Sequence, residues 1–279
     1  MKKIVGLTLI LFTICFSNQA FPEAAYQLSM LPRYSFEEIN KRITPLAAYL
    51  SKKTGIAIEP VFINNFSQYE KQLNTGSIGI GYENPYIYIL VSKSHEVVAM
   101  TLKGEGKDKF RGIIIVKADS DIVAIDDLKG KRISIVAKSS ACGFLSQKLT
   151  MLEHGLNVEK DCTITEAIDN KQENVIFAVY TGDADAGFIR ESALNRIDKF
   201  VPPAMIRVIN QSAWLPNWAL SVSRSMPEEK KEAIKKALID LKENDPVLKA
   251  LKIIKFRPAA DKEYDSIRKA SGMTIPKRN

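Results

Sequence analysis

From Tyr26 onward, short apolar runs alternate with longer stretches in which apolar residues recur every three or four positions. The first pattern predicts strands and the second predicts helices packed on a core. Ser35 precedes the first helical stretch, with Glu38 three residues later and Gly55 at its end, which are typical start and stop signals. The expected elements are strands at residues 27–31, 56–62 and 78–82 and helices at residues 35–55 and 67–73. This β-α-β-α-β order favours a parallel sheet flanked by helices.

The same order recurs in the second half of the chain with a different sequence. The expected strands lie at residues 112–116, 132–137, 162–167 and 184–189, with helical segments at residues 125–131, 139–155 and 174–180. We therefore expect an α/β protein of two lobes, each a mostly parallel sheet flanked by helices, with a ligand-binding cleft between them.

Short chain crossings are expected to join the two lobes, because no low-complexity linker interrupts the sequence. We place the crossings near residues 109–111 and 215–217. Lobe 1 then comprises residues 26–110, to which residues 218–279 return, and lobe 2 comprises residues 111–217.

The N-terminus reads as a secretory signal peptide at residues 1–20. Lys2 and Lys3 precede an apolar run of about 13 residues that ends in small and polar residues. A membrane anchor is the alternative, but this run is shorter than the roughly 18–20 residues that span a bilayer. Large residues before Cys15 argue against a lipoprotein. We expect export to the periplasm as a soluble protein.

Composition excludes several functional classes. The 279 residues carry a net charge of +8, or about +6 without the signal peptide, and the basic residues alternate with acidic ones. This distribution indicates a mild preference for anions and does not favour nucleic acid. The sequence has no P-loop, no Gly-x-Ser-x-Gly elbow and no His-Glu-x-x-His motif. We expect no metal site and no cofactor.

The segment 138–143 is the strongest candidate for a binding site. Ser139, Ser140, Ala141 and Cys142 lie between a predicted strand and a predicted helix, where free backbone N–H groups and the helix dipole attract anions. An ordinary serine cap of the helix is the alternative, and it is compatible with anion binding.

Further candidates follow the predicted carboxyl ends of strands, where α/β sheets bind ligands. Tyr82, Asn84 and Tyr88 offer hydroxyl and amide groups there, although each tyrosine is equally expected as a core residue. Arg190 is placed to bind an anion or to pair with Glu191. The candidates on the rim of lobe 1 are Tyr34 and Ser35, and Trp214 and Trp218 are expected either to wall the cleft or to pack at the crossing.

Several motifs occur together in an order that resembles a known family. These are residues 45–50 with Thr54-Gly55, residues 81–88, residues 110–112, residues 128–132 and residues 183–187. They resemble the phosphate, phosphite and phosphonate substrate-binding proteins of ABC importers from about Leu28 to Pro227. The resemblance implies a type II periplasmic-binding-protein fold whose two lobes close over a ligand.

The resemblance also assigns positions in the binding site. Ser140 matches one of the family's hydroxyl residues, whereas Ala141 and Cys142 replace two others. Phe110 stands where the family usually has tyrosine, and Gln172 stands where many members have histidine. The hydroxyl groups that contact the ligand in the family are therefore partly missing here.

The leading functional hypothesis is a periplasmic, monomeric solute-binding protein that delivers a small anionic ligand to an ABC permease in the inner membrane. The alternative uses the same fold as sensory input to a membrane histidine kinase. A third, enzymatic hypothesis makes Cys142 a nucleophile activated at a helix N-terminus, with Glu83 as a conceivable base.

The cysteines Cys142 and Cys162 are predicted to be free thiols. They fall at opposite ends of neighbouring parallel strands, roughly 16 Å apart by strand geometry, whereas a disulfide requires Cα atoms within about 7 Å. Cys142 is expected to be the more reactive of the two if the cleft is open.

Overall fold

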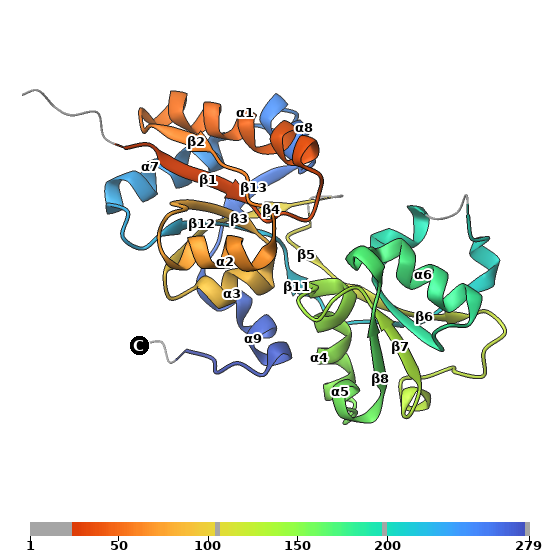
Figure 1. Cartoon of the computed structure of the whole chain (residues 1–279). Helices are drawn as coiled ribbons and strands as arrows, with labels where there is room; N and C mark the ends of the chain where they lie inside the picture. The colour runs from red at the N-terminus through yellow and green to blue at the C-terminus, as the bar shows by residue number, and fades with distance from the viewer. Residues whose placement is uncertain (1–23, 104–106, 197–199, 277–279) are drawn as a thin grey trace, which may run out of the picture.

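A computed structural model describes residues 24–103, 107–196 and 200–276 of the chain. The described residues form two α/β lobes joined by a pair of crossing segments (Figure 1). The predicted signal peptide lies outside the described residues. No helix in the described ranges has the length and hydrophobicity needed to cross a membrane.

Lobe 1 is built on a six-stranded sheet with the order β13-β4-β12-β3-β1-β2. Its strands are β1 (Tyr26–Met30), β2 (Ile58–Pro60), β3 (Ile80–Glu83), β4 (His95–Leu102), β12 (Ala219–Ser223) and β13 (Lys255–Pro258). Its helices are α1 (Phe36–Thr54), α2 (Phe66–Asn74), α3 (Pro85–Val91), α7 (Glu228–Asp240), α8 (Pro246–Leu251) and α9 (Asp265–Ser271), with a short 3₁₀ turn η6 (Asp261–Tyr264).

Lobe 2 is built on a five-stranded sheet with the order β10-β6-β9-β7-β8. Its strands are β6 (Gly112–Lys117), β7 (Arg132–Ile135), β8 (Thr163–Glu166), β9 (Ala186–Arg190) and β10 (Ile206–Gln211). Its helices are the π turn η2 (Ala141–Leu145), α4 (Ser146–Glu153), α5 (Val158–Asp161) and α6 (Gln172–Thr181), with 3₁₀ turns η1 (Asp126–Leu128), η3 (Ile168–Asn170), η4 (Glu191–Arg196) and η5 (Pro203–Met205).

Both sheets are mixed, which corrects the expectation of mostly parallel sheets. The pairs β1–β2, β1–β3, β7–β8 and β7–β9 are parallel, as the helical crossovers require. Strands β12 and β6, which the chain enters directly from the crossing segments, are antiparallel to their neighbours, and β13 and β10 at the sheet edges are antiparallel to β4 and β6. The α/β class and the two-lobed architecture are confirmed.

Local sequence signals set the ends of helix α1 as predicted. The Ser35 hydroxyl accepts a hydrogen bond from the Glu38 backbone N–H, and Gly55 adopts a left-handed conformation with φ of 74° just after the helix. Apolar residues on one face, including Ile39, Ile43 and Leu46, are fully or almost fully buried in the core of lobe 1. The N-terminus of this buried helix therefore fixes the preceding loop, residues 31–35, whose first four residues line the cavity between the lobes.

The crossings form a two-stranded antiparallel ladder at the predicted positions. Strand β5 (Lys109–Phe110) pairs with β11 (Leu215–Pro216). This ladder lies between the lobes, and we refer to it as the hinge (Figure 1).

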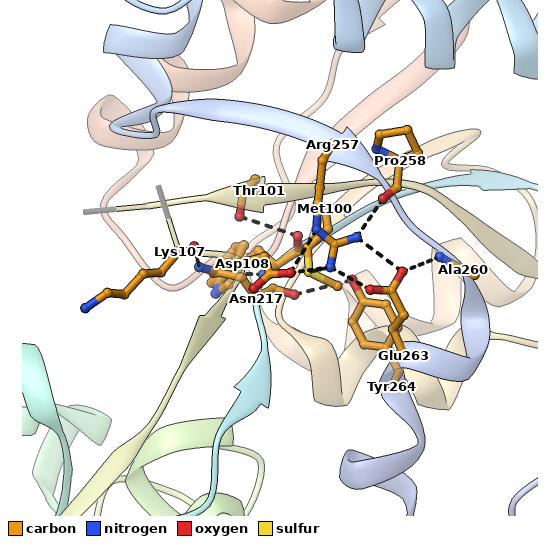
Figure 2. A network of polar contacts seen from close by, with 11 residues as sticks. Met100, Thr101, Lys107, Asp108, Asn217, Arg257, Pro258, Ala260, Glu263 and Tyr264 are labelled. Carbon is orange, nitrogen blue, oxygen red and sulfur yellow. Dashed lines mark hydrogen bonds and ion pairs between the residues drawn. The ribbon is translucent and has the colours of Figure 1, made fainter. Parts of the chain in front are cut away.

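A polar network fastens the hinge to lobe 1. The Arg257 guanidinium donates to the Asp108 carboxylate at 2.6 Å and to the Glu263 carboxylate at 2.5 Å (Figure 2). The Asn217 backbone N–H donates to the Asp108 carbonyl at 2.8 Å, and the Tyr264 hydroxyl donates to the Asn217 carbonyl at 3.3 Å. Both hinge strands are thus held by β13 and η6 of lobe 1.

The C-terminal helix α9 contacts both lobes. It packs on α3 of lobe 1 and on η2 and α4 of lobe 2. Ile267 and Ala270 are completely buried in a core cluster that includes Phe144 and Leu145 of η2. The last helix therefore links the lobes in addition to the two hinge strands.

Candidate ligand-binding cleft

A cavity of about 680 Å³ lies between the lobes and contains most of the predicted site residues. Lobe 1 contributes the loop after β1, the segment before α2 and the end of β3, and lobe 2 contributes η2, the start of α6 and the end of β9. The predicted residues that line it are Tyr34, Asn84, Phe110, Ser139, Ser140, Ala141, Cys142, Gln172 and Arg190.

The turn η2 presents backbone donors to this cavity. The Ser140 hydroxyl accepts a hydrogen bond from the Gly143 N–H at 3.1 Å, which makes Ser140 the cap of the turn. Within the described ranges, the N–H groups of Ala141 and Cys142 have no hydrogen-bond partner. The two interpretations of this segment, a serine cap and an anion site, are therefore compatible. Ser140 caps the turn, and two backbone donors remain for an anion.

The Gln147 side chain holds η2 against the sheet. Its amide nitrogen lies within hydrogen-bond distance of the Cys142, Ile113 and Ile189 carbonyls, at 2.9–3.1 Å. Ile189 precedes Arg190, so one buried side chain fixes both the anion-binding turn and the strand that carries the arginine.

Arg190 has no carboxylate partner in the described part of the chain. Its guanidinium lies 4.7 Å from the centroid of the Phe110 ring, and its backbone N–H donates to the side-chain amide oxygen Oε1 of Gln172 at 2.8 Å. The expected alternative, a pair between Arg190 and Glu191, is wrong, because Glu191 makes a bidentate ion pair with Arg111.

Arg33 supplies a second guanidinium from the other lobe. It lies 5.0 Å from the Tyr34 ring and 5.4 Å from the Trp218 ring, at the cavity wall. Burial raises the pKa of the Cys142 thiol well above its ordinary value, although the positive charges of Arg190 and Arg33 oppose that shift. Both arginines thus act electrostatically on the turn η2.

Residues 28–264 match a protein family described as the periplasmic substrate-binding protein of phosphonate ABC transporters. The chain belongs to this family. It is also 22% identical over 193 residues to the phosphate-import protein PhnD of Mycolicibacterium smegmatis, and the match covers 65% of this chain and about 60% of the length of that relative.

Solved structures share the fold of this binding protein. XAC2383 from Xanthomonas citri, bound to chloride, superposes with a TM-score of 0.74 at 18% identity, covering 89% of this chain and 96% of that one. PhnD1 from Prochlorococcus marinus, in complex with methylphosphonate, superposes with a TM-score of 0.71 at 14% identity, covering 89% and 97% of the two chains.

Three predicted site residues do not line the cleft of this binding protein. Tyr82 is 1% exposed and packs against the Trp218 ring, with a centroid distance of 5.2 Å. Tyr88 is completely buried, and its hydroxyl donates to the Asp261 carboxylate at 2.9 Å. Both tyrosines are core residues because β3 and α3 turn these side chains away from the cleft, and Ser35 serves only as the cap of α1.

Other lining residues were missed by sequence reasoning. Arg33 lies in the loop that follows β1, next to Tyr34, so the same strand-end argument that selected Tyr34 would have found it. Asn64 and Asn65 precede α2, and no motif marked them as cleft residues. Asp169 and Asn170 line the cavity in a left-handed conformation, with φ of 55° and 52°, which only the structure reveals.

A smaller cavity of about 340 Å³ adjoins the main one at the hinge. The two cavities share Tyr34, Phe110 and Arg190. Trp214, 43% exposed, lines the smaller cavity, whereas Trp218, 1% exposed, contributes to the larger one. Both tryptophans therefore reach a cavity wall, and Trp218 also packs in the core.

The described residues contain no group of three or more potential metal ligands from His, Cys, Asp and Glu. The thiol of Cys142 is 3% exposed and its raised pKa keeps it protonated, which is the opposite of the activation that the enzymatic hypothesis requires. Glu83, its conceivable base, is completely buried in lobe 1 with Tyr69 as its partner and does not line the cavity. The site geometry is that of a binding cleft.

Proposed function

We propose that this protein captures a small phosphonate-like or phosphate-like oxyanion in the periplasm and delivers it to an ABC permease. The observation that carries the proposal is that Arg190 lines the same cavity between the lobes as Ala141 and Cys142, whose N–H groups have no hydrogen-bond partner among the described residues. Backbone donors at a turn and a planar guanidinium are complementary to the tetrahedral oxygens of such a ligand.

The proposed binding step uses residues from both lobes. Ser139, Ser140, Ala141, Cys142, Gln172 and Arg190 belong to lobe 2, Tyr34 and Asn84 to lobe 1, and Phe110 to the hinge. A ligand that contacts both sides stabilises the closed arrangement, because it gains contacts only when the lobes approach each other. We propose a monomer for this cycle, since each chain carries both walls of the cleft.

The oxyanion preference is tested directly with the mature protein. Calorimetric titration with methylphosphonate, phosphate, phosphite and methanesulfonate is expected to show binding of at least one phosphorus oxyanion. Arg190→Gln is expected to weaken that binding by roughly tenfold to a hundredfold, since a hydrogen bond to a charged group contributes about 1.5–3 kcal/mol.

Lys160→Gln is the matched control, because Lys160 is exposed on α5 of lobe 2, outside both cavities. It removes one positive charge from the same lobe and is expected to leave the affinity unchanged. The proposal would be contradicted if none of the four anions binds, or if Arg190→Gln and Lys160→Gln lower the affinity by the same factor.

The sensory alternative has less support, since the matching family is one of transport proteins. Deletion of the gene distinguishes the two roles. For a transport component, we expect the deletion strain to lose growth on the bound phosphorus compound while its transcriptional response to that compound stays unchanged.

A further inference from the structure

The smaller cavity at the hinge is strongly basic. Seven of the side chains that line it are Lys or Arg, and one is acidic. The basic residues are Arg42, Lys103, Lys107, Lys109, Arg111, Arg190 and Lys252. The chain as a whole is only mildly basic, with 40 Lys and Arg residues against 32 Asp and Glu residues, so the excess of positive charge is concentrated at this place.

Only part of this charge is neutralised by carboxylates. Arg111 pairs with Glu191, the single acidic lining residue. Arg42 and Lys252 share the Glu38 carboxylate, each at 2.6 Å. Lys109 and Arg190 have no carboxylate partner among the residues that the structure describes. Like charges gathered in a cavity attract multivalent anions.

Several of these groups are held in place before a ligand arrives. Arg42 is 5% exposed and also donates to the Leu251 carbonyl, so its position is set by the core of lobe 1. The Arg111 guanidinium lies 4.6 Å from the centroid of the Trp214 ring while it pairs with Glu191. A preorganised set of donors loses less side-chain entropy on binding than free surface lysines do.

The hinge cavity is continuous with the oxyanion site through shared residues. Arg190, Phe110 and Tyr34 line both cavities, so Arg190 is within reach of two neighbouring anionic groups. A ligand that fills both cavities therefore needs a second anionic group that is joined to the first by a short spacer.

We infer that the hinge cavity is a second anion subsite, and that the protein takes ligands in which further phosphate groups adjoin the first, as in a linear polyphosphate or an organic triphosphate. The inference rests on the proposed oxyanion site for the first group. It extends that function from a single oxyanion to a chain of them.

Calorimetric titration of the mature protein tests this inference. The probes are methylphosphonate, phosphate, pyrophosphate, tripolyphosphate and a nucleoside triphosphate. Affinity is expected to rise from phosphate to tripolyphosphate and to decrease more steeply with added salt for the longer anions. The nucleoside triphosphate shows whether an organic substituent is accepted, and tighter binding of either triphosphate than of phosphate supports the inference.

The variant Lys109→Gln/Lys252→Gln removes one charge from the hinge and one from lobe 1. We expect it to weaken tripolyphosphate binding about tenfold more than methylphosphonate binding. Lys160→Gln/Lys249→Gln is the matched control, since both lysines are exposed and neither lines a cavity. Thermal unfolding of both double variants shows that the fold is retained.

The outcomes separate this inference from the proposed function. If methylphosphonate or phosphate binds and the longer anions bind no tighter, the hinge subsite is wrong and the proposed function stands. The same conclusion follows if the variant Lys109→Gln/Lys252→Gln lowers the affinity for every probe by the same factor. If only the triphosphates bind and the hinge variant weakens them, the subsite stands and the single-oxyanion proposal is wrong. If no probe binds, both are wrong.

Discussion

The Arg190 guanidinium lies over the ring of Phe110, 4.7 Å from its centroid. Arg190 is the last residue of β9 in lobe 2, and Phe110 belongs to the hinge strand β5. The contact holds the cation at the junction of the two cavities without neutralising its charge. A carboxylate in the same place would have competed with an anionic ligand.

Phe110→Leu is expected to weaken oxyanion binding about two- to fivefold. The substitution removes a cation–π contact of roughly 0.5–1 kcal/mol and lets the Arg190 side chain sample other rotamers. Calorimetry on Phe110→Leu, Arg190→Gln and the double variant measures the coupling. Additive effects of the two substitutions would show that the ring does not act through the arginine.

Tyr82→Phe and Tyr88→Phe are expected to differ in stability although both remove one buried hydroxyl. The Tyr82 hydroxyl has no well-aligned hydrogen-bond partner among the described residues, so its loss should change the free energy of unfolding by less than about 1 kcal/mol. The Tyr88 hydroxyl donates to Asp261, so its loss should cost about 1–3 kcal/mol. Urea unfolding monitored by circular dichroism measures the free energy of unfolding of both variants. A larger loss of stability in Tyr82→Phe than in Tyr88→Phe would contradict the hydrogen bonding described for the two hydroxyls.

The buried carboxyl of Glu83 is expected to make stability pH-dependent. Burial raises the pKa of Glu83 from 4.5 to about 8, although hydrogen bonds from Ser221 and Tyr69 oppose the shift. The folded protein therefore binds a proton that the unfolded chain releases between about pH 4.5 and pH 8. The contribution of Glu83 to stability is complete below pH 4.5 and is lost as the pH rises through this window.

Glu83→Gln removes this contribution, so the variant should gain stability relative to the wild type as the pH rises from 4.5 to 8. His95 contributes in the opposite direction, because burial lowers its pKa to about 4 and the neutral ring is favoured in the fold. Because His95 and Glu83 both bond the Ser221 hydroxyl, the two proteins are compared most cleanly between pH 6.5 and 8, where the His95 ring is mostly neutral in the folded and unfolded states. A pH-independent difference between the two unfolding free energies would contradict the expectation.

Alkylation is expected to reach Cys162 before Cys142. The structure confirms two free thiols, and β7 and β8 are parallel as the argument required. The expected order of reactivity is wrong, because Cys142 is 3% exposed and burial raises its pKa. Burial also raises the pKa of Cys162, to about 11, but its side chain is partly exposed. Mass spectrometry after timed iodoacetamide treatment at pH 8 checks the order, and earlier labelling of Cys142 would contradict it.

Periodicity and caps were sufficient to predict helix α1 and the parallel strands of both sheets. The apolar spacing from Ile39 to Leu50 and the glycine at position 55 mark α1, and the strand-end rule selects the turn at Ser140. These signals are local, and tertiary packing agrees with them. The antiparallel strands β4 and β13 were missed because their partners are distant in sequence.

Side-chain direction was the main property that sequence reasoning failed to predict. Tyr82 and Asn84 lie two residues apart at one strand end, yet the first faces the core and the second the cavity. Helix α3 begins at Pro85, immediately after that strand, and carries Tyr88 into the core beside Tyr264. Which face is buried depends on the C-terminal segment, whose return to lobe 1 was expected but whose packing against α3 no local pattern predicts.

Helix α9 gives the molecule a third attachment between its lobes, away from the hinge ladder. Because Ile267 and Ala270 are buried among residues of η2, any change in the angle between the lobes must slide this helix over one of its neighbours. Packed helices slide by only about 1–2 Å before their side chains must repack. The opening angle is therefore limited mechanically, and a fluorophore attached near the C-terminus would report the motion of the lobes.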